Sequence, residues 1–228
     1  MRVKRPVALL FALGLLIAPV GCSTQITGVP QAASGPVPLA IAQDGFGIVA
    51  GFEDAPARIE IFTEPQCTHC GDLQHDFGDE IAYNLTIGTL QVTYRPLTFL
   101  DDGPDGYSAK VANALFLSTE AIDNYAATGT QFQRFVEELW INQDPGGPVF
   151  TGDELREMAV AAGIPEAVAD HLANHQEGID VAEMEDANYR LLLDVDSVDT
   201  GTPTGYDLEA GEKLDLTDAD WLDNLVSQ

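Results

Sequence analysis

The sequence predicts an α/β protein in which a block of short helices separates two stretches of β-structure. Runs of β-branched residues lie before residue 100, and helical spacing of apolar residues fills most of 107–199. A Cys-X-X-Cys pair, Cys67 and Cys70, follows directly after one of the expected strands. The chain has 228 residues, 45 % of them hydrophobic, which is enough for one domain with a sizeable insertion.

Three strands are expected before the helical block. The run 46–51 is apolar and ends at glycine, while 58–62 is rich in β-branched residues and follows a turn at 53–56. The third run, 91–100, contains Pro96, which marks its end or an edge position. These strands predict a sheet that helices can cover.

A helix is expected to begin at Cys67, because apolar residues recur there at intervals of four. Five more helices are expected over 107–128, 130–142, 151–162, 165–175 and 178–194. Thr151 and Glu154 form a capping-box pattern, Gly163 is a helix stop, and Pro165 suits the first turn of the next helix.

β-structure is expected again after the helices. The run 206–216 predicts a short hairpin around Ala210-Gly211. The run 217–225 predicts a final helix with Thr217 as its N-cap.

The charge of the chain is strongly acidic. It has 37 acidic against 10 basic residues, for a net charge of −27. Such a field repels nucleic acid and anionic lipid head groups, so no nucleic-acid partner is expected. A solvated acidic surface explains this charge, and a selective attraction for basic partners is the alternative.

The first 21 residues predict an export signal. Arg2, Lys4 and Arg5 precede the apolar stretch 7–20, which is shorter than the roughly 20 residues that span a bilayer. Pro19-Val20-Gly21-Cys22 resembles a bacterial lipobox, although a leucine is usual where Pro19 stands. We therefore expect lipid modification of Cys22. Simple secretory cleavage near Gly21 is the alternative.

Residues 22–45 are rich in Ser, Gly, Pro, Gln and Ala and are expected to form a flexible tether. The protein is thus expected to be extracytoplasmic and anchored by lipid to the cell membrane. A secreted or periplasmic soluble protein is the alternative.

The Cys67–Cys70 pair has the spacing of a redox-active dithiol. Residues at i and i+3 on one helical turn can bring two sulfurs within bonding distance. The free N–H groups of a helix start favour a thiolate at Cys67, which is the nucleophile, and Cys70 would resolve the mixed disulfide. Thr68 and His69 lie between the two, and His69 offers positive charge and a hydrogen-bond donor to the thiolate.

Two other interpretations of the pair stay open. It could be an inert disulfide, or half of a metal site with His69 or His75. The sequence has no second Cys-X-X-Cys or suitably spaced His pair, so we predict no metal and no cofactor. The spacing of His171 and His175 is more typical of surface histidines.

The chain resembles the DsbA-like branch of the thioredoxin superfamily over roughly 46–226. The features are the strand 59–62 leading to the cysteine pair, the helices after 91–94, and Gly201-Thr202-Pro203-Thr204. The resemblance implies a thioredoxin-like fold with an inserted helical domain. Residues 46–106 and 200–228 would form the thioredoxin-like part, and 107–199 the insertion.

The resemblance also implies roles for Thr202 and Pro203. Pro203 would be cis and lie opposite Cys67, and Thr202 would offer backbone groups to a substrate strand. An ordinary trans turn is the alternative. Ile61 stands where the family often has a buried acid, and Thr68 where proline is frequent. Neither Glu60 nor Glu64 can be assigned a proton-transfer role from the sequence.

The expected function is exchange of the Cys67–Cys70 disulfide with cysteines of exported proteins, with the protein acting as oxidant. A reductase or isomerase of the same fold, or a non-catalytic lipid-anchored binding protein, is the alternative. The expected partners are reduced exported proteins and a membrane redox partner, and the protein is expected to be a monomer.

Overall fold

Two buried parallel strands form the centre of the structure, a computed structural model that describes residues 35–103 and 105–227. The predictions for the signal, for Cys22 and for the tether before residue 35 lie outside the described residues. The strands are β1 (Leu39–Ile41), β2 (Ile48–Ala50), β3 (Ala57–Thr63), β4 (Leu90–Pro96), β5 (Thr204–Asp207) and β6 (Glu212–Leu214). They form one mixed sheet in the order β1-β2-β4-β3-β5-β6.

The register of the sheet follows from the two central strands. β3 and β4 pair in parallel from Ala57 opposite Leu90 to Thr63 opposite Pro96, and every other pair of neighbours is antiparallel. Parallel strands covered on both faces are continuously apolar, and Ile59, Ile61 and Phe62 of β3 are fully buried. The carboxyl end of β3 leads directly to the cysteine pair.

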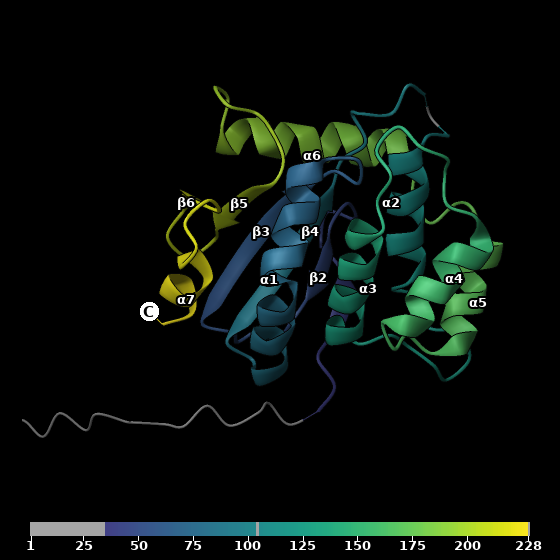
Figure 1. Cartoon of the computed structure of the whole chain (residues 1–228). Coiled ribbons are helices and arrows are strands. Elements are labelled where there is room, and N and C mark those ends of the chain that lie inside the picture. Colours follow the sequence, from purple (N-terminus) through teal and green to yellow (C-terminus); the bar gives the residue numbers. More distant parts are fainter. Residues whose placement is uncertain (1–34, 104, 228) are drawn as a thin grey trace, which may run out of the picture. The chain divides into compact units, whose positions relative to one another are not determined.

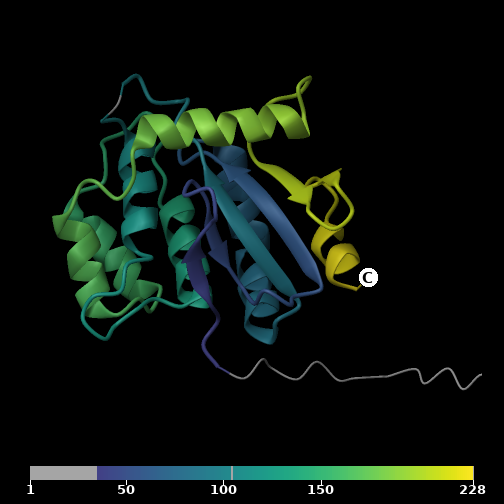
Figure 2. The same ribbon diagram turned by 180° about the vertical axis from the view of Figure 1, so that it is seen from behind.

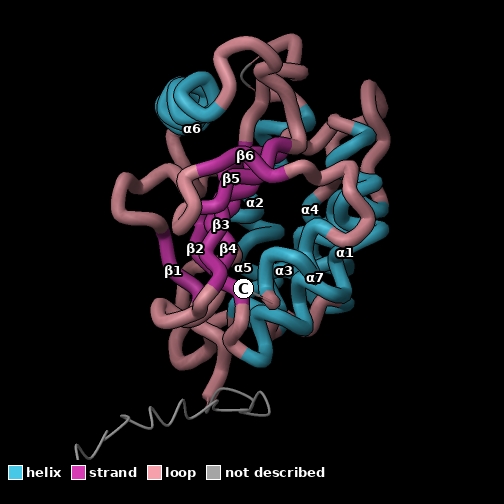
Figure 3. The backbone as a smooth tube through the Cα atoms, turned by 90° about the vertical axis from the view of Figure 1, so that its left-hand side faces the viewer, coloured by secondary structure: helices cyan, strands magenta, loops and turns pink. Residues whose placement is uncertain are grey.

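Helices cover both faces of this sheet. They are α1 (Thr68–Ile87), α2 (Tyr107–Leu117), α3 (Gly129–Ile141), α4 (Gly152–Ala161), α5 (Glu166–Asn174), α6 (Val181–Val195) and α7 (Trp221–Val226). Figure 3 shows α6 on one side of the sheet and α1, α3 and α7 on the other. The five helices α2–α6 lie between β4 and β5 in the chain, so the predicted helical insertion is confirmed (Figure 1).

The insertion packs onto the sheet through α3. Phe132 and Phe135 of α3 are fully buried, and Phe132 contacts Tyr94 of β4 edge to face at 5.3 Å between ring centres. The buried Tyr94 hydroxyl donates to Gln133, whose amide donates to Gln74 of α1 at 2.8 Å. Each fully buried large side chain contributes about 1.5–3 kcal/mol, so insertion and sheet share one core.

The N-terminal tether prediction is wrong for its last part. Val37 is buried, and β1 pairs with β2 from Leu39 opposite Ala50 to Ile41 opposite Ile48. The strand covers the edge that β2 would otherwise expose, which explains why a short Pro- and Ala-rich segment is ordered here. Residues 37–45 therefore belong to the folded unit (Figure 2).

Three predicted boundaries also differ. The helix expected over 107–128 ends at Leu117, where the hydroxyls of Ser118 and Thr119 bond backbone carbonyls of the last turn. The third strand ends at Pro96. The last helix begins at Trp221, because Thr217 donates its N–H and hydroxyl to Asp215 instead of capping a helix.

Other local predictions are confirmed. Thr151 and Glu154 form the reciprocal capping box of α4. Gly163 has a left-handed φ of 83°, as expected of a residue that ends a helix. The hairpin of β5 and β6 turns at Gly211, whose φ of 71° also requires glycine.

The contact of α3 with the N-terminal segment predicts the effect of one substitution. A Cβ at Gly129 would lie 2.6 Å from the Pro38 carbonyl oxygen and 2.7 Å from the Val37 side chain. Gly129→Ala should therefore lower the free energy of unfolding by about 1–2 kcal/mol, measured by urea denaturation. Gly103→Ala is the control, because no atom lies within 4 Å of its Cβ position. Equal stability of the two variants would contradict this packing.

Candidate active site

Cys67 lies at the junction of β3 and α1. It is the N-cap residue of α1, with φ −73° and ψ 114°, and no side chain caps this helix end. The amides of Cys70 and Gly71 donate to its carbonyl at 3.1 and 3.2 Å. The Cys67 side chain is half-buried and Cys70 is buried, and both are free thiols. The predicted placement of the pair at a strand-to-helix junction is confirmed.

The surroundings of Cys67 favour its thiolate. A hydrogen bond from the Cys70 thiol is the main reason that the Cys67 pKa falls to about 5, despite the opposing effect of burial. The Thr202 side chain and the backbone N–H groups of Cys70 and His69 lower the pKa further. Cys67 is thus a thiolate at neutral pH.

Cys70 has the opposite tendency. Burial raises its pKa well above the usual range, and its hydrogen bond to Cys67 and the charge of Cys67 add to the effect. The two sulfurs therefore divide into an accessible thiolate and a buried thiol. This difference would suit Cys67 to be a nucleophile and Cys70 to be a resolving group.

The Thr202-Pro203 peptide bond is cis, as the resemblance implied. Cys67 Sγ lies 3.1 Å from the Thr202 carbonyl oxygen, which accepts a hydrogen bond from Cys67 when the thiol is protonated. Thr204 begins β5 and pairs with Phe62 of β3, so the sheet itself holds the proline loop next to the cysteine. Residues 135 positions apart in the chain are in this way brought into contact.

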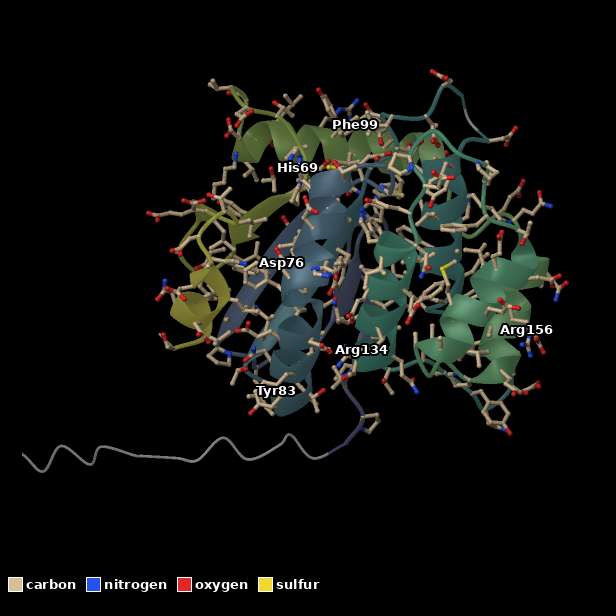
Figure 4. All side chains as sticks on the ribbon, in the orientation of Figure 1. His69, Asp76, Tyr83, Phe99, Arg134 and Arg156 are labelled. Atoms are coloured by element: carbon tan, nitrogen blue, oxygen red, sulfur yellow. The ribbon has the colours of Figure 1, made fainter. Side chains whose placement is uncertain are left out.

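Thr68 and His69 are exposed on the first turn of α1. The backbone N–H of His69 is among the groups that lower the Cys67 pKa, and its imidazole lines a groove beside the proline loop. Figure 4 shows His69 at one end of α1 and Tyr83 toward the other. The four predicted site residues are thus adjacent: Cys67 is the N-cap of α1, and Thr68, His69 and Cys70 form its first turn.

Glu64 is a functional candidate to which the sequence assigned no role. Its side chain is fully buried, and burial raises its pKa to about 7. The Gln66 N–H donates to it at 2.6 Å, and the Ser108 hydroxyl donates to its other oxygen. Glu60 instead pairs with Arg95 at 2.7 Å. The sequence does show an acid three positions before Cys67. Only burial in the fold, however, distinguishes Glu64 from Glu60.

The insertion holds the loop before Cys67 in place. Gln143 of the loop after α3 donates to the Pro65 and Cys67 carbonyl oxygens at 2.8 and 3.2 Å. Gln66 donates to Asp101 at 2.9 Å, and Asp101 in turn accepts the Ser108 N–H at 2.9 Å. The loop geometry therefore depends on residues of both parts of the fold.

His75, His171 and His175 make their contacts away from the cysteine pair. His75 contacts Asp76 at 2.9 Å, while His171 contacts Glu120 at 2.9 Å and stacks on His175. Within residues 35–103 and 105–227, no group of three His, Cys, Asp or Glu side chains is arranged to hold a metal ion. The same residues include no helix with the length and hydropathy of a membrane span.

Solved structures with the same architecture include a protein described as a thiol-disulfide oxidoreductase. The MdbA protein of Corynebacterium diphtheriae matches with a TM-score of 0.67 and 19 % identity, over 85 % of this chain and 95 % of its own. Chlamydia trachomatis DsbA matches with a TM-score of 0.60 and 18 % identity, over 89 % and 95 %. BdbD of Bacillus subtilis matches with a TM-score of 0.54 and 19 % identity, over 78 % and 90 %.

No family model and no curated protein sequence matches the chain. The structural similarity shows the fold: a DsbA-like thioredoxin fold with a helical insertion, as the sequence predicted. Within that fold, the site is a Cys-X-X-Cys pair at a helix N-terminus beside a cis-proline.

The titration of Cys67 can be predicted from its surroundings. In a Cys22→Ala background, the reduced protein should show a thiolate midpoint near pH 5 by ultraviolet absorbance or by the pH dependence of alkylation. Cys70→Ala should raise this midpoint, because it removes the hydrogen bond that lowers the Cys67 pKa most. A midpoint near the ~8.5 of a free cysteine would contradict this environment.

Glu64 predicts a pH dependence of stability. Its pKa is raised from 4.5 to about 7 in the folded chain, so the folded state binds the proton more tightly. The free energy of unfolding of the oxidised protein should therefore fall by about 3 kcal/mol as the pH rises from below 4.5 to above 7.

Glu64→Gln tests this assignment, because the amide has no proton to lose in that range. Urea denaturation of the oxidised variant should lack this fall, whereas the exposed control Glu53→Gln should keep it. An unchanged pH dependence in Glu64→Gln would refute the assignment.

Proposed function

We propose that this protein is a thiol:disulfide oxidoreductase that passes a Cys67–Cys70 disulfide to cysteine pairs of exported proteins. One observation carries the proposal. The Cys67 sulfur has a pKa of about 5 at an uncapped helix start and lies 3.1 Å from the carbonyl of a cis Thr202-Pro203 bond. That geometry supports both halves of the reaction, nucleophile activation and peptide binding.

The reaction begins with the oxidised pair. A substrate thiolate attacks Cys67, which is half-buried while Cys70 is buried, and the Cys67–Cys70 bond breaks. The electron pair leaves on Cys70, which takes up a proton because its pKa is high. A mixed disulfide then joins the substrate to Cys67. The backbone of the substrate segment can form hydrogen bonds with the backbone of Thr202 beside it.

The second substrate thiolate attacks the substrate sulfur of the mixed disulfide. The substrate disulfide forms, the bond to Cys67 breaks, and Cys67 leaves as a thiolate. Two electrons have moved from the substrate thiols to the pair. One of the two thiol protons stays on Cys70 and the other goes to solvent.

The low pKa of Cys67 supports the oxidant direction. A sulfur with a low pKa is a good leaving group, so the second step is fast. A thiolate that the fold stabilises also favours the reduced protein, which makes its disulfide more oxidising. A reductase or isomerase of the same fold is the alternative direction, and a non-catalytic binding protein is the alternative class.

The sequence supports the proposed setting. An export signal over 1–21 and a lipid-modified Cys22 would place the domain outside the cytoplasm, on a tether that runs from Cys22 to about residue 36. Its partners would be reduced exported proteins and a membrane protein that reoxidises the pair. We propose that it acts as a monomer.

The test uses the chain from residue 23 with its pair oxidised. It should restore activity to a reduced, unfolded disulfide protein, and Cys67→Ser should abolish this. Cys70→Ala should instead accumulate the mixed disulfide when offered an oxidised substrate. Full activity of Cys67→Ser would refute the enzyme proposal.

The direction of transfer is tested separately. Equilibration with glutathione should give a reduction potential well above the approximately −270 mV of thioredoxin, towards the approximately −120 mV of DsbA. A value near that of thioredoxin would refute the oxidant direction and leave the reductase alternative.

A further inference from the structure

A groove of about 560 Å³ runs along α1 beside the proline loop. One wall is α1 from His69 to Phe77, and the other comes from residues 199–204 and 213–217. The apolar part of its lining is Leu73, Phe77, Pro203 and Leu216. The groove therefore starts at the cysteine pair and continues along the helix that carries it.

The charged lining of the groove is mostly acidic. Asp72 and Asp76 line it from α1 and Asp199 from the opposite wall. The lysine in its lining, Lys213, has its ammonium 2.8 Å from Asp196, which balances its charge. Asp76 contacts His75 at 2.9 Å, whereas in the described part of the chain neither Asp72 nor Asp199 has an ion-pair partner, so the groove keeps an excess of negative charge.

We propose that this groove selects substrates with lysine or arginine close to the reacting cysteine. The substrate segment would lie extended along α1, with its apolar parts on the groove floor and its cationic side chains on the acidic residues. This inference rests on the proposed function, because the groove binds the same chain whose cysteine reacts with Cys67.

The spacing of the acids predicts the positions of the basic residues. Asp72 lies five residues beyond Cys67 and Asp76 nine, so they lie about 7.5 and 13.5 Å along the helix axis. An extended chain advances about 3.3 Å per residue. Basic residues two and four positions from the substrate cysteine therefore match Asp72 and Asp76. Side chains at these positions also point to the same side of an extended chain.

The experiment measures how fast single-cysteine peptides reduce the oxidised protein. The peptides carry Lys, Gln or Glu at positions two and four on either the N-terminal or the C-terminal side of the cysteine. A nearby lysine also lowers the pKa of the peptide thiol and so changes its intrinsic reactivity. Each rate constant is therefore divided by the rate constant for the reaction of the same peptide with a small-molecule disulfide. Dithiothreitol serves as a thiol without peptide contacts.

We expect the normalised rate of the Lys peptide to exceed that of the Glu peptide by about tenfold at low salt, on one side of the cysteine. The difference should shrink at high salt. In the Asp72→Asn/Asp76→Asn double variant the ratio should fall to about twofold, and Asp199→Asn should lower it in part.

The matched control is Glu53→Gln/Asp54→Asn. It removes two exposed negative charges from the turn before β3, at the opposite end of that strand from Cys67, and should keep the wild-type ratio. Equal normalised rates in the wild type, or an equal loss of selectivity in this control, would overturn the inference. If neither dithiothreitol nor any peptide reduces the oxidised protein, the proposed function itself fails.

Discussion

The structure depends on the free backbone N–H groups at the start of α1. No side chain occupies this helix end, so the Cys67 sulfur receives the N–H groups of His69 and Cys70. A serine or aspartate cap would have satisfied the same donors and made the helix more stable on its own. In this fold the Cys67 thiolate accepts these N–H groups instead, so the stability of α1 is linked to the ionisation of Cys67. The pairing of β3 with β5 then sets the proline loop against the same sulfur.

A buried acid accompanies this thiolate. Glu64 is shielded from water and keeps its proton up to about pH 7, because a charged carboxylate would be poorly solvated there and would repel Cys67. Its hydrogen bond from Ser108 comes from the insertion, and its bond from Gln66 comes from the active-site loop. The Glu64 carboxyl group thus lies close to the charge of Cys67 and also joins the active-site loop to α2 of the insertion.

Much of this arrangement could be predicted from the sequence, because its signals are local. The strand before Cys67, the helix after it and the capping box of α4 depend on neighbouring residues. β1 was missed because three residues gain their order only from the edge of β2. The sequence could not distinguish Glu60 from Glu64 for a similar reason. Ser108 of α2 contacts Glu64 and Arg95 pairs with Glu60, and both partners lie far along the chain.

Gln143 reaches the Cys67 carbonyl because Gly71 has no side chain. A Cβ at Gly71 would lie 2.4 Å from the Gln143 amide oxygen, so the Gln143 side chain would have to shift to make room for one. The helix that carries the cysteines and the loop that follows α3 therefore have matching surfaces. An insertion without an equivalent amide at this position would leave the Pro65 and Cys67 carbonyl oxygens without the hydrogen bonds that Gln143 donates. The helical insertion is in this sense part of the scaffold that holds the loop before Cys67.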